Sequence, residues 1–561
     1  MVMNNRLINI LQLAIGFMVL VVVNQLVDRF PLRFDLTEEK RYSISEASIE
    51  VLESLQEPVY VEVFLEGEMP AGFKRLQKAI KETLDQLEYY SGKQVKYSFK
   101  DPSIAKSTKG RNEYFRSLMQ RGLQPTNLNY TRDGNKTEKL IFPGAIVSYY
   151  GRELPVLLLK GNQGATAEEQ LNQSIEGIEY ELVSAIRNLS TDVKKNVGLV
   201  LGHQEPDSLN LAGLTGVLAA KYNVFKIDLP TREKDLSVYD AVILPKPTTT
   251  FSDKEKYLLD QYIMQGGKAL FFIDALRVNM DSASGEGTYA FPYELGLDDM
   301  LFRYGVRVNR NFVQDIFSGE FPVVAGMTGD QPQIRMLPWP FFPNINTFGD
   351  HPITKNLDVV QTRFVSTIDT VRADGVEKIP LLMTSQYSMV SATPVKVAFN
   401  ELQKNLDPKR FTSGSKAVAY LLKGNFTSLY KNRLLPKGMS KAEFVAEGQE
   451  AALLVCADGD MIRNEFDLKT GEPLELGLSP YNQQKYANAD FVLNALDYML
   501  NENGVITSKS KEIKIRPLDK VQIGEEKLYW QLLNLVLPIV LLLVYGVLRV
   551  FWRKRKYANF K

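Results

Sequence analysis

The side chains best suited to chemistry follow two predicted strands. His203, Glu205 and Asp207 come directly after the apolar run 197–201, and Asp274 follows the apolar run 268–273. Ligands of parallel α/β sheets bind at the carboxyl ends of the strands, so we expect these four residues to line a ligand-binding crevice. An imidazole beside carboxylates could also act as an acid–base pair, although a histidine in such a turn is more often a hydrogen-bonded structural residue.

The sequence offers no complete catalytic set to accompany them. Cys456 is the only cysteine, and its apolar neighbours predict a buried structural thiol. His351, the second of two histidines, lies in a loop-like Asp-His-Pro sequence, which excludes a histidine-rich metal site. The phosphate-loop pattern Gly-x-x-x-x-Gly-Lys-Ser/Thr is absent from the sequence. We therefore predict a non-enzymatic protein without a cofactor or a metal.

An enzymatic alternative stays open at this point. A membrane-tethered envelope hydrolase or transferase could use His203, Glu205 and Asp274 if their side chains converged within hydrogen-bond reach at a pocket. If they diverge, or are held in structural bonds, that alternative fails.

Composition excludes other classes of function. The 561 residues carry a net charge of +1, with 45% hydrophobic and 24% charged residues, which is typical of a globular protein. A nucleic-acid-binding protein needs a basic face to neutralise phosphates, and no basic run lies inside the body of the chain. No nucleic-acid partner is expected.

Two α/β domains are predicted to position the candidate residues. Within residues 28–160, a strand at 59–65, a helix at 73–90 and a strand at 95–99 form a βαβ unit, and a hairpin turns at Gly151-Arg152. The size of this domain is thioredoxin-like. Residues 161–280 and 388–515 alternate helices with apolar strands, which predicts a doubly wound parallel sheet.

Residues 281–387 are predicted to be a loop-rich insertion into that second domain. The sequence Pro-Trp-Pro-Phe-Phe-Pro does not suit a helix or a central strand. Trp339, Phe341 and Phe342 are therefore candidate partner contacts on an exposed loop, or else part of packed irregular structure.

Both ends of the chain are predicted to span a membrane. Residues 7–27 and 529–551 are each long and apolar enough to cross the ~30 Å hydrocarbon core, and residues 516–528 form a linker before the second span. Trp530 and Trp552 suit its two interfaces. The tail 552–561 begins with a basic cluster, Arg553, Lys554, Arg555 and Lys556.

The basic cluster sets the expected orientation. Positive residues beside a span favour the cytoplasm, so residues 1–6 and the tail are placed inside, and residues 28–528 in the periplasm. Arg29, Arg33, Lys40 and Arg41 after the first span favour the opposite arrangement, which leaves a cytosol-facing scaffold as an alternative.

Several segments resemble a known family. They are RFDLTEEKRYSIS, LGHQEPD, FSDKEKYLLDQYIMQGGKALFFID, DHPITKNL and NADFVLNALDYMLNENGVITSKSKEIKIRPLD. In this order they resemble the GldG-type, gliding-motility-associated components of the ABC transporter auxiliary family. The resemblance implies a non-enzymatic auxiliary or substrate-binding subunit of the bacterial inner membrane, partnered by a separate permease and ATPase. It supplies no catalytic residues and no substrate.

Overall fold

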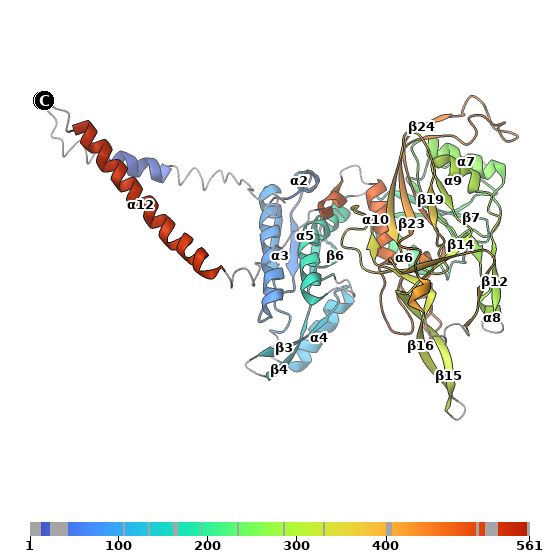
Figure 1. Ribbon diagram of the computed structural model, residues 1–561, viewed down its shortest axis with the longest axis horizontal. Helices are drawn as coiled ribbons and strands as arrows, with labels where there is room; N and C mark the ends of the chain where they lie inside the picture. The colour runs from blue at the N-terminus through green and yellow to red at the C-terminus, as the bar shows by residue number, and fades with distance from the viewer. Residues whose placement is uncertain are drawn as a thin grey trace. The chain divides into compact units, whose positions relative to one another are not determined.

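The computed structural model describes residues 13–22, 43–104, 107–132, 135–160, 166–191, 193–232, 235–283, 287–328, 331–399, 407–500, 504–510 and 526–557 (Figure 1). The chain divides into two units, residues 1–512 and 513–561. Each unit is described by itself.

The first domain of the large unit is built on a four-stranded sheet in the order β2-β1-β5-β6. As predicted, β1 and β2 run parallel around the crossover helix α3, and β5 and β6 form a hairpin. Tyr150 and Gly151 form its turn with φ of 50° and 74°, a conformation that favours glycine at the second position. The elements are α2 (Glu46–Glu53), β1 (Val59–Val63), α3 (Ala71–Tyr90), β2 (Val95–Phe99), α4 (Thr108–Gln120), β3 (Thr126–Arg132), β4 (Asn135–Ile141), β5 (Gly144–Tyr149) and β6 (Arg152–Leu157).

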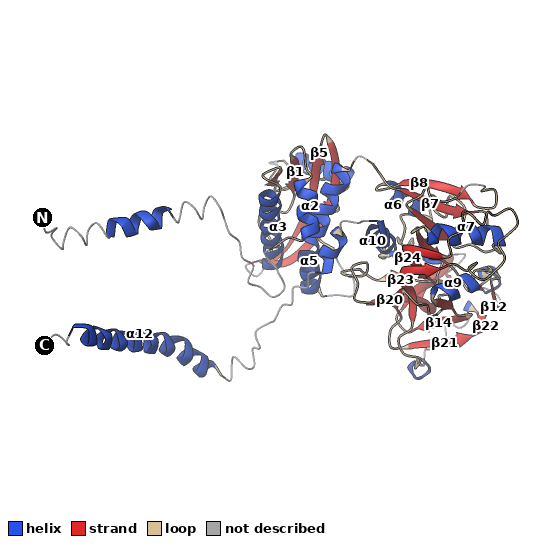
Figure 2. Ribbon diagram, turned by 90° about the horizontal axis from the view of Figure 1, so that it is seen from above, coloured by secondary structure: helices blue, strands red, loops and turns tan. Residues whose placement is uncertain are grey.

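Helix α5 (Ala167–Ser190) completes this domain, and the boundary predicted at residue 160 is therefore wrong. Thr166 and Glu169 form a capping box at its start. Its buried face, including Leu182 and Ile186, belongs to the same hydrophobic core as β1 and α3. Figure 2 shows α5 beside α2, α3 and the strands of this sheet. Burial of this apolar stripe, rather than chain order, decides to which domain the helix belongs.

The second domain is built on an eight-stranded sheet in the order β17-β20-β23-β24-β10-β9-β7-β8. The strands from β24 to β8 are parallel, as predicted. The other three strands are antiparallel, so the sheet is mixed and the prediction of a parallel sheet is corrected. Its strands are β7 (Asn196–Leu201), β8 (Asn223–Asp228), β9 (Ala241–Pro245), β10 (Lys268–Phe272), β17 (Thr347–Phe348), β20 (Val376–Met383), β23 (Ala417–Thr427) and β24 (Glu447–Cys456).

Helices and short 3-10 turns cover this sheet. A capping box of Ser252 and Glu255 begins α7, and Gly305 in the left-handed conformation ends α9. The α-helices are α6 (Ala212–Ala219), α7 (Asp253–Met264), α8 (Met280–Ala283), α9 (Asp298–Tyr304) and α10 (Asn488–Leu500). The 3-10 helices are η2 (Pro408–Arg410), η3 (Asp460–Ile462) and η4 (Val505–Ser510). Helix η4 lies within the segment 388–515 predicted to belong to the second domain, but Val505 and Ile506 pack in the core of the first domain, against α2 and α5.

The predicted loop-rich insertion is rich in strands. It supplies β17 and β20 to the large sheet and forms a long hairpin of β15 and β16, visible at the lower edge of Figure 1. On β16 the paired residues pass from Pro338 directly to Pro343, so residues 339–342 form a bulge. Proline has no backbone N–H to donate to a neighbouring strand, and a bulge is one of the places in a sheet where it is tolerated. The smaller strands are β11 (Leu276–Arg277), β12 (Thr288–Pro292), β13 (Val306–Val308), β14 (Asn311–Asp315), β15 (Ser318–Thr328), β16 (Gln331–Ile345), β18 (Val360–Gln361), β19 (Ile368–Thr370), β21 (Ser388–Ala392) and β22 (Val395–Val397).

That bulge places three aromatic residues in a core. Trp339, Phe341 and Phe342 are only 1%, 2% and 3% exposed. They pack with Phe312 and Phe364. The proposal of an exposed contact loop is therefore wrong, and the alternative of packed structure holds, because the bulge turns these rings inward.

The small unit contains helix α12 (Lys527–Tyr557). Its stretch Lys527–Arg555 is long and apolar enough to cross a membrane, with mean hydropathy 2.4 and no part buried. It is the one such helix in the described part of the chain. Of the predicted first span 7–27, the structure describes only the apolar helix Leu13–Val22. The rest of this segment lies outside the described residues, so a membrane crossing by residues 7–27 stays a prediction.

Candidate functional site

The order of the parallel strands defines where a ligand would be expected. From one edge, the strands run β8-β7-β9-β10-β24, which in chain order is second, first, third, fourth and fifth. The strand order therefore reverses between β7 and β9. In doubly wound sheets a ligand binds outside the carboxyl ends of the strands at this reversal.

In the loop after β7, a side-chain carboxylate of the loop occupies the position where backbone N–H groups could bind an anion. Gly202 has φ of 117°, and the backbone N–H groups of Gly202 and His203 point to one place. Both donate to Oε2 of Glu205, at 2.9 and 2.8 Å. Converging backbone N–H groups favour an anion, and here the anion is the chain's own carboxylate.

The ring of His203 is packed rather than presented to solvent. It is 2% exposed and stacks on Phe251 with ring centroids 3.6 Å apart. Its Nε2 lies 3.4 Å from Glu255 Oε2, and its Nδ1 lies 3.6 Å from Glu205 Oε1. Burial alone would lower the pKa of the imidazole, but the two carboxylates outweigh it and raise that pKa above 6.5. The group is a charge-paired core histidine.

The backbone also bridges the two strand ends. The N–H of Thr248, in the loop after β9, donates to the carbonyl of His203 at 2.8 Å. This bond and the stacked ring of Phe251 join the loops on either side of the reversal point. The usual ligand position is thus occupied by residues of the chain itself.

A second charged cluster lies at the ends of β9, β10 and β24. Lys246 follows β9, and its Nζ lies 2.9 Å from Asp274 Oδ2 and 2.5 Å from Asp460 Oδ1. Asp274 Oδ1 also accepts the N–H of Gly459 at 2.5 Å. Burial alone would lower the pKa of Lys246, yet the two carboxylates raise it above its ordinary value. The ammonium is held charged between them.

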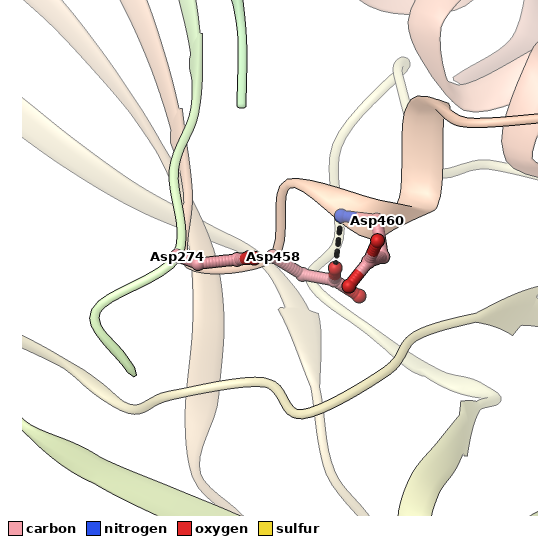
Figure 3. Close-up of side chains that lie close together, drawn as sticks. All are labelled: Asp274, Asp458 and Asp460. Atoms are coloured by element: carbon pink, nitrogen blue, oxygen red, sulfur yellow. Dashed lines mark hydrogen bonds between the residues drawn. The ribbon is translucent and has the colours of Figure 1, made fainter. Parts of the chain in front are cut away.

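Asp458 completes the cluster seen in Figure 3, where its side chain lies between those of Asp274 and Asp460. It accepts the N–H groups of Asp460 at 2.7 Å and Arg363 at 2.7 Å. Burial raises its pKa well above the usual range, and Asp274 adds to this effect. The pKa of Asp460 is lowered, because Lys246 outweighs the effect of burial.

The three carboxylates have a spacing that a metal ion could use. Their oxygens lie within 4.8 Å of one another, and carboxylates suit hard divalent cations. The Lys246 ammonium already contacts two of the three. We therefore assign the cluster to a buried ion-pair network, and the sequence-based expectation of no metal stays a prediction.

The four residues predicted to share a crevice have different surroundings. His203 and Glu205 lie together. Asp207 is exposed and accepts the backbone and side-chain N–H groups of Asn210, at 2.8 and 2.9 Å, in a local turn. Asp274 belongs to the Lys246 cluster. The structure therefore places these side chains in separate hydrogen-bond networks, and ligand binding by them stays a prediction.

Four members of these clusters were not predicted from the sequence: Glu255, Lys246, Asp458 and Asp460. Lys246, Asp458 and Asp460 immediately follow β9 and β24, so the same strand-end rule, applied to every predicted strand, would have found them. Glu255 carried a different signal. It is the third residue of α7 and closes a capping box with Ser252. This local role explains a glutamate at that position, so the sequence gives no sign of its contact with His203.

A protein of Borreliella burgdorferi, named only as an uncharacterized protein, is 19% identical over 579 residues. The alignment covers 99% of this chain and 100% of that protein. The correspondence thus extends along both entire chains.

Comparison with solved structures gives weak matches. The mmIFT52 N-terminal domain aligns with TM-score 0.28 and 12% identity, over 54% of this chain and 97% of that chain. The exo-beta-1,4-mannosidase Op5Man5 from Opitutaceae bacterium strain TAV5 aligns with TM-score 0.20 and 9% identity, over 76% and 51%. Neither score supports an argument about fold or function.

Family comparison is more informative. Residues 38–148 match a domain of unknown function, DUF7088, which covers the first α/β domain from α2 into β5 and leaves out β6 and α5. Residues 194–495 match the family described as an ABC-type uncharacterized transport system, and this match begins just before β7 and ends within α10. Because it covers more than half of the chain, the protein belongs to this family of ABC-type transport system auxiliary components.

Proposed function

We propose that the protein is a non-enzymatic auxiliary subunit of a bacterial ABC-type transporter. Two membrane helices would anchor it to the inner membrane beside a separate permease and ATPase. Its α/β domains, in the periplasm, would bind a ligand or a protein partner. Family membership supports the link to transport; the partners, the compartment and the two-span topology are parts of the proposal.

The observation that carries the proposal is the exposed apolar surface of α12. Its 29-residue apolar stretch is ~44 Å long at ~1.5 Å per residue, more than the ~30 Å hydrocarbon core requires. Leu541 and Leu542 are 60% and 70% exposed. Such a surface needs lipid or another membrane helix to cover it.

The strand-end clusters support a role without catalysis. His203 is held by Phe251 and two glutamates, and Asp274 by Lys246 and Gly459. A general base must reach a proton on a substrate, and these groups are buried in internal bonds. The hydrolase alternative therefore has no observation in its favour.

Copurification tests the subunit role. The tagged full chain, extracted from its native membrane in detergent, should recover a permease and an ATPase. Leu541→Arg places a charge in the middle of α12, at a cost of ~3 kcal/mol in a membrane, and should reduce this recovery. Leu528→Arg, near the end of the helix, is the matched control and should leave it unchanged. Failure of the wild-type chain to recover either partner would refute the role.

Labelling tests the orientation. Ser440 is exposed and the only native cysteine, Cys456, is buried, so Ser440→Cys gives a single reactive position. A membrane-impermeant maleimide should label it in intact spheroplasts. Labelling only after lysis would instead support the cytosol-facing arrangement.

The association with gliding motility is a narrower proposal that rests on sequence resemblance. Deleting the gene from a gliding host should abolish spreading on agar, and the wild-type gene should restore it. Normal spreading of the deletion strain would remove this part of the proposal.

A further inference from the structure

A small cavity lies where α5 ends and the chain enters β7. Its volume is about 100 Å³, enough for a few water molecules or one small anion. Its walls come from the last turns of α5, the residues just before β7, the turn after α6 and Asp497 on α10. The cavity thus lies between helices of both α/β domains, within the large unit.

The charges lining this cavity are unbalanced. Among the described residues that line it, four cations, Arg187, Lys194, Lys195 and Lys221, face one carboxylate, Asp497, which leaves an excess of three positive charges. Like charges gathered in one place repel each other. A bound anion would relieve this repulsion.

The single carboxylate is already fully engaged. Asp497 Oδ2 accepts the hydroxyl of Tyr180 at 2.8 Å and Lys221 Nζ at 3.0 Å, and Oδ1 accepts the hydroxyl of Tyr222 at 2.6 Å. Burial would raise its pKa, but Lys221 and the two hydroxyls outweigh that effect and lower it. Asp497 therefore compensates Lys221 and leaves the other three cations.

Within the described part of the chain, those three cations have neutral partners or none. Lys194 Nζ donates to the carbonyls of Ala219 and Ala220, and Lys195 Nζ donates to the carbonyl of Leu500 at 2.7 Å. Carbonyl oxygens satisfy a donor without cancelling its charge. Arg187 Nη1 is buried and has no hydrogen-bond acceptor among the described residues, which is costly for a charged group.

We propose that this cavity binds a phosphate group. A phosphate carries about −1.5 to −2 charges near pH 7 and several strong acceptor oxygens, which matches an excess of positive charge and an unused guanidinium donor. The volume admits the phosphate itself, either as the free ion or as the headgroup of an ester. Because the walls belong to both domains, the bound anion links them. This inference does not depend on the transporter role.

Titration of the full chain with inorganic phosphate tests the proposal. Calorimetry in detergent, at constant ionic strength set with chloride, should show saturable binding at one site per chain. Arg187→Gln should weaken it by about tenfold to a hundredfold, since a charged hydrogen bond contributes ~1.5–3 kcal/mol. Arg372→Gln is the matched control. Arg372 is exposed and pairs with Asp374 away from the cavity, and its loss should leave the affinity unchanged.

A second variant guards against misfolding of the first. Asn188 is an exposed residue at the cavity, so Asn188→Asp adds a negative charge with little effect on packing and should also weaken binding several-fold. Circular dichroism of each variant reports the fold. Absence of saturable phosphate binding, or equal affinities of the wild-type, Arg187→Gln and Asn188→Asp chains, would overturn the proposal.

Glycerol 3-phosphate distinguishes the two sources of the phosphate group. Competition with inorganic phosphate would support an ester headgroup as the natural ligand. Exclusion of the ester, with binding of inorganic phosphate intact, would support the free ion.

Discussion

The strand ends of the large sheet and the cavity beside α5 are both rich in charged side chains, but their charges are balanced differently. At the strand ends, Lys246 lies between two aspartates and His203 between two glutamates. At the cavity, the hydrogen bonds of Lys194 and Lys195 to described residues all go to carbonyls. The expected ligand position of this fold is therefore saturated internally. The cavity beside α5, which the fold does not lead one to expect as a ligand site, has an excess of positive charge. In this protein, uncompensated charge is therefore a better guide to a ligand site than strand order.

The largest effect is expected from breaking the balance at the strand ends. Lys246→Met would leave Asp274 buried without its cation, and would leave Asp460 with only its ion pair to Arg463 among the described residues. Removing one partner of a buried ion pair destabilises by about 3–5 kcal/mol, so the urea midpoint of the full chain in detergent should fall sharply.

The matched control for this change is Lys226→Met. Among the described residues, Lys226 bonds to the hydroxyl of Ser208 at an exposed position, and its loss should cost less than about 0.5 kcal/mol. Equal midpoints for the two variants would show that the strand-end cluster is not the balanced network described above.

An intermediate effect is expected at the cavity. Asp497→Asn removes the charge that holds Lys221, Tyr180 and Tyr222, and should cost about 2–3 kcal/mol at pH 7. The folded pKa of Asp497 lies below the ordinary 3.8, so its contribution is complete above that value and is lost as the pH falls through the folded pKa. Urea unfolding from pH 7 to pH 3 should show wild type and variant converging.

Asp497→Asn also tests whether positive charge at the cavity determines its affinity for phosphate. It raises the excess charge at the cavity from three to four, so phosphate affinity should increase several-fold even though the fold is weaker. A loss of affinity would mean that Asp497 orders the cavity more than it opposes the anion.

The smallest effect is expected from His203→Phe, which keeps a ring against Phe251 but removes the charge between the glutamates. The raised pKa of His203 gives a contribution that is complete below pH 6.5 and is lost as the pH rises through the folded pKa. The wild-type advantage should be about 1.5 kcal/mol, the low end for a charged hydrogen bond, because the two contacts are 3.4 and 3.6 Å long. It should shrink above pH 6.5 in urea unfolding.

His351→Phe provides the control of opposite sign. Burial lowers the pKa of His351 to about 4, so the folded wild type resists protonation and loses stability relative to this variant as the pH falls from 6.5 to 4. Identical pH profiles for the two histidine variants would contradict the assignment of His203 as a charge-paired residue.

Individual helices, strands and turns could be predicted from local sequence patterns, but the strands and side chains that they pair with could not. The turn at Gly151 and the strands at the apolar runs 197–201 and 268–273 were predicted correctly, because each depends on neighbouring residues. Asp274 and Gly459 meet across 185 positions, since β24 pairs with β10 only after a long strand-rich segment. No local pattern contains that pairing.

The two sites differ in the same way. The strand-end rule pointed to His203 and Asp274, but strand order decided that they belong to different clusters. For the cavity, Lys194 and Lys195 are only a basic pair before a strand in the sequence. Their role depends on α5 packing in the first domain and on Asp497 arriving from α10. The bulge at Pro338 also needs the β15 ladder to be recognised.

The most direct test of the contrast between the two regions is the anomalous scattering of crystals of the full chain soaked in tungstate, an oxyanion of the same charge type as phosphate. We expect the strongest peak in the cavity, beside Arg187 and Lys195, and none at the loops after β7, β10 and β24. A peak at those strand ends, or an empty cavity at saturating tungstate, would contradict the account.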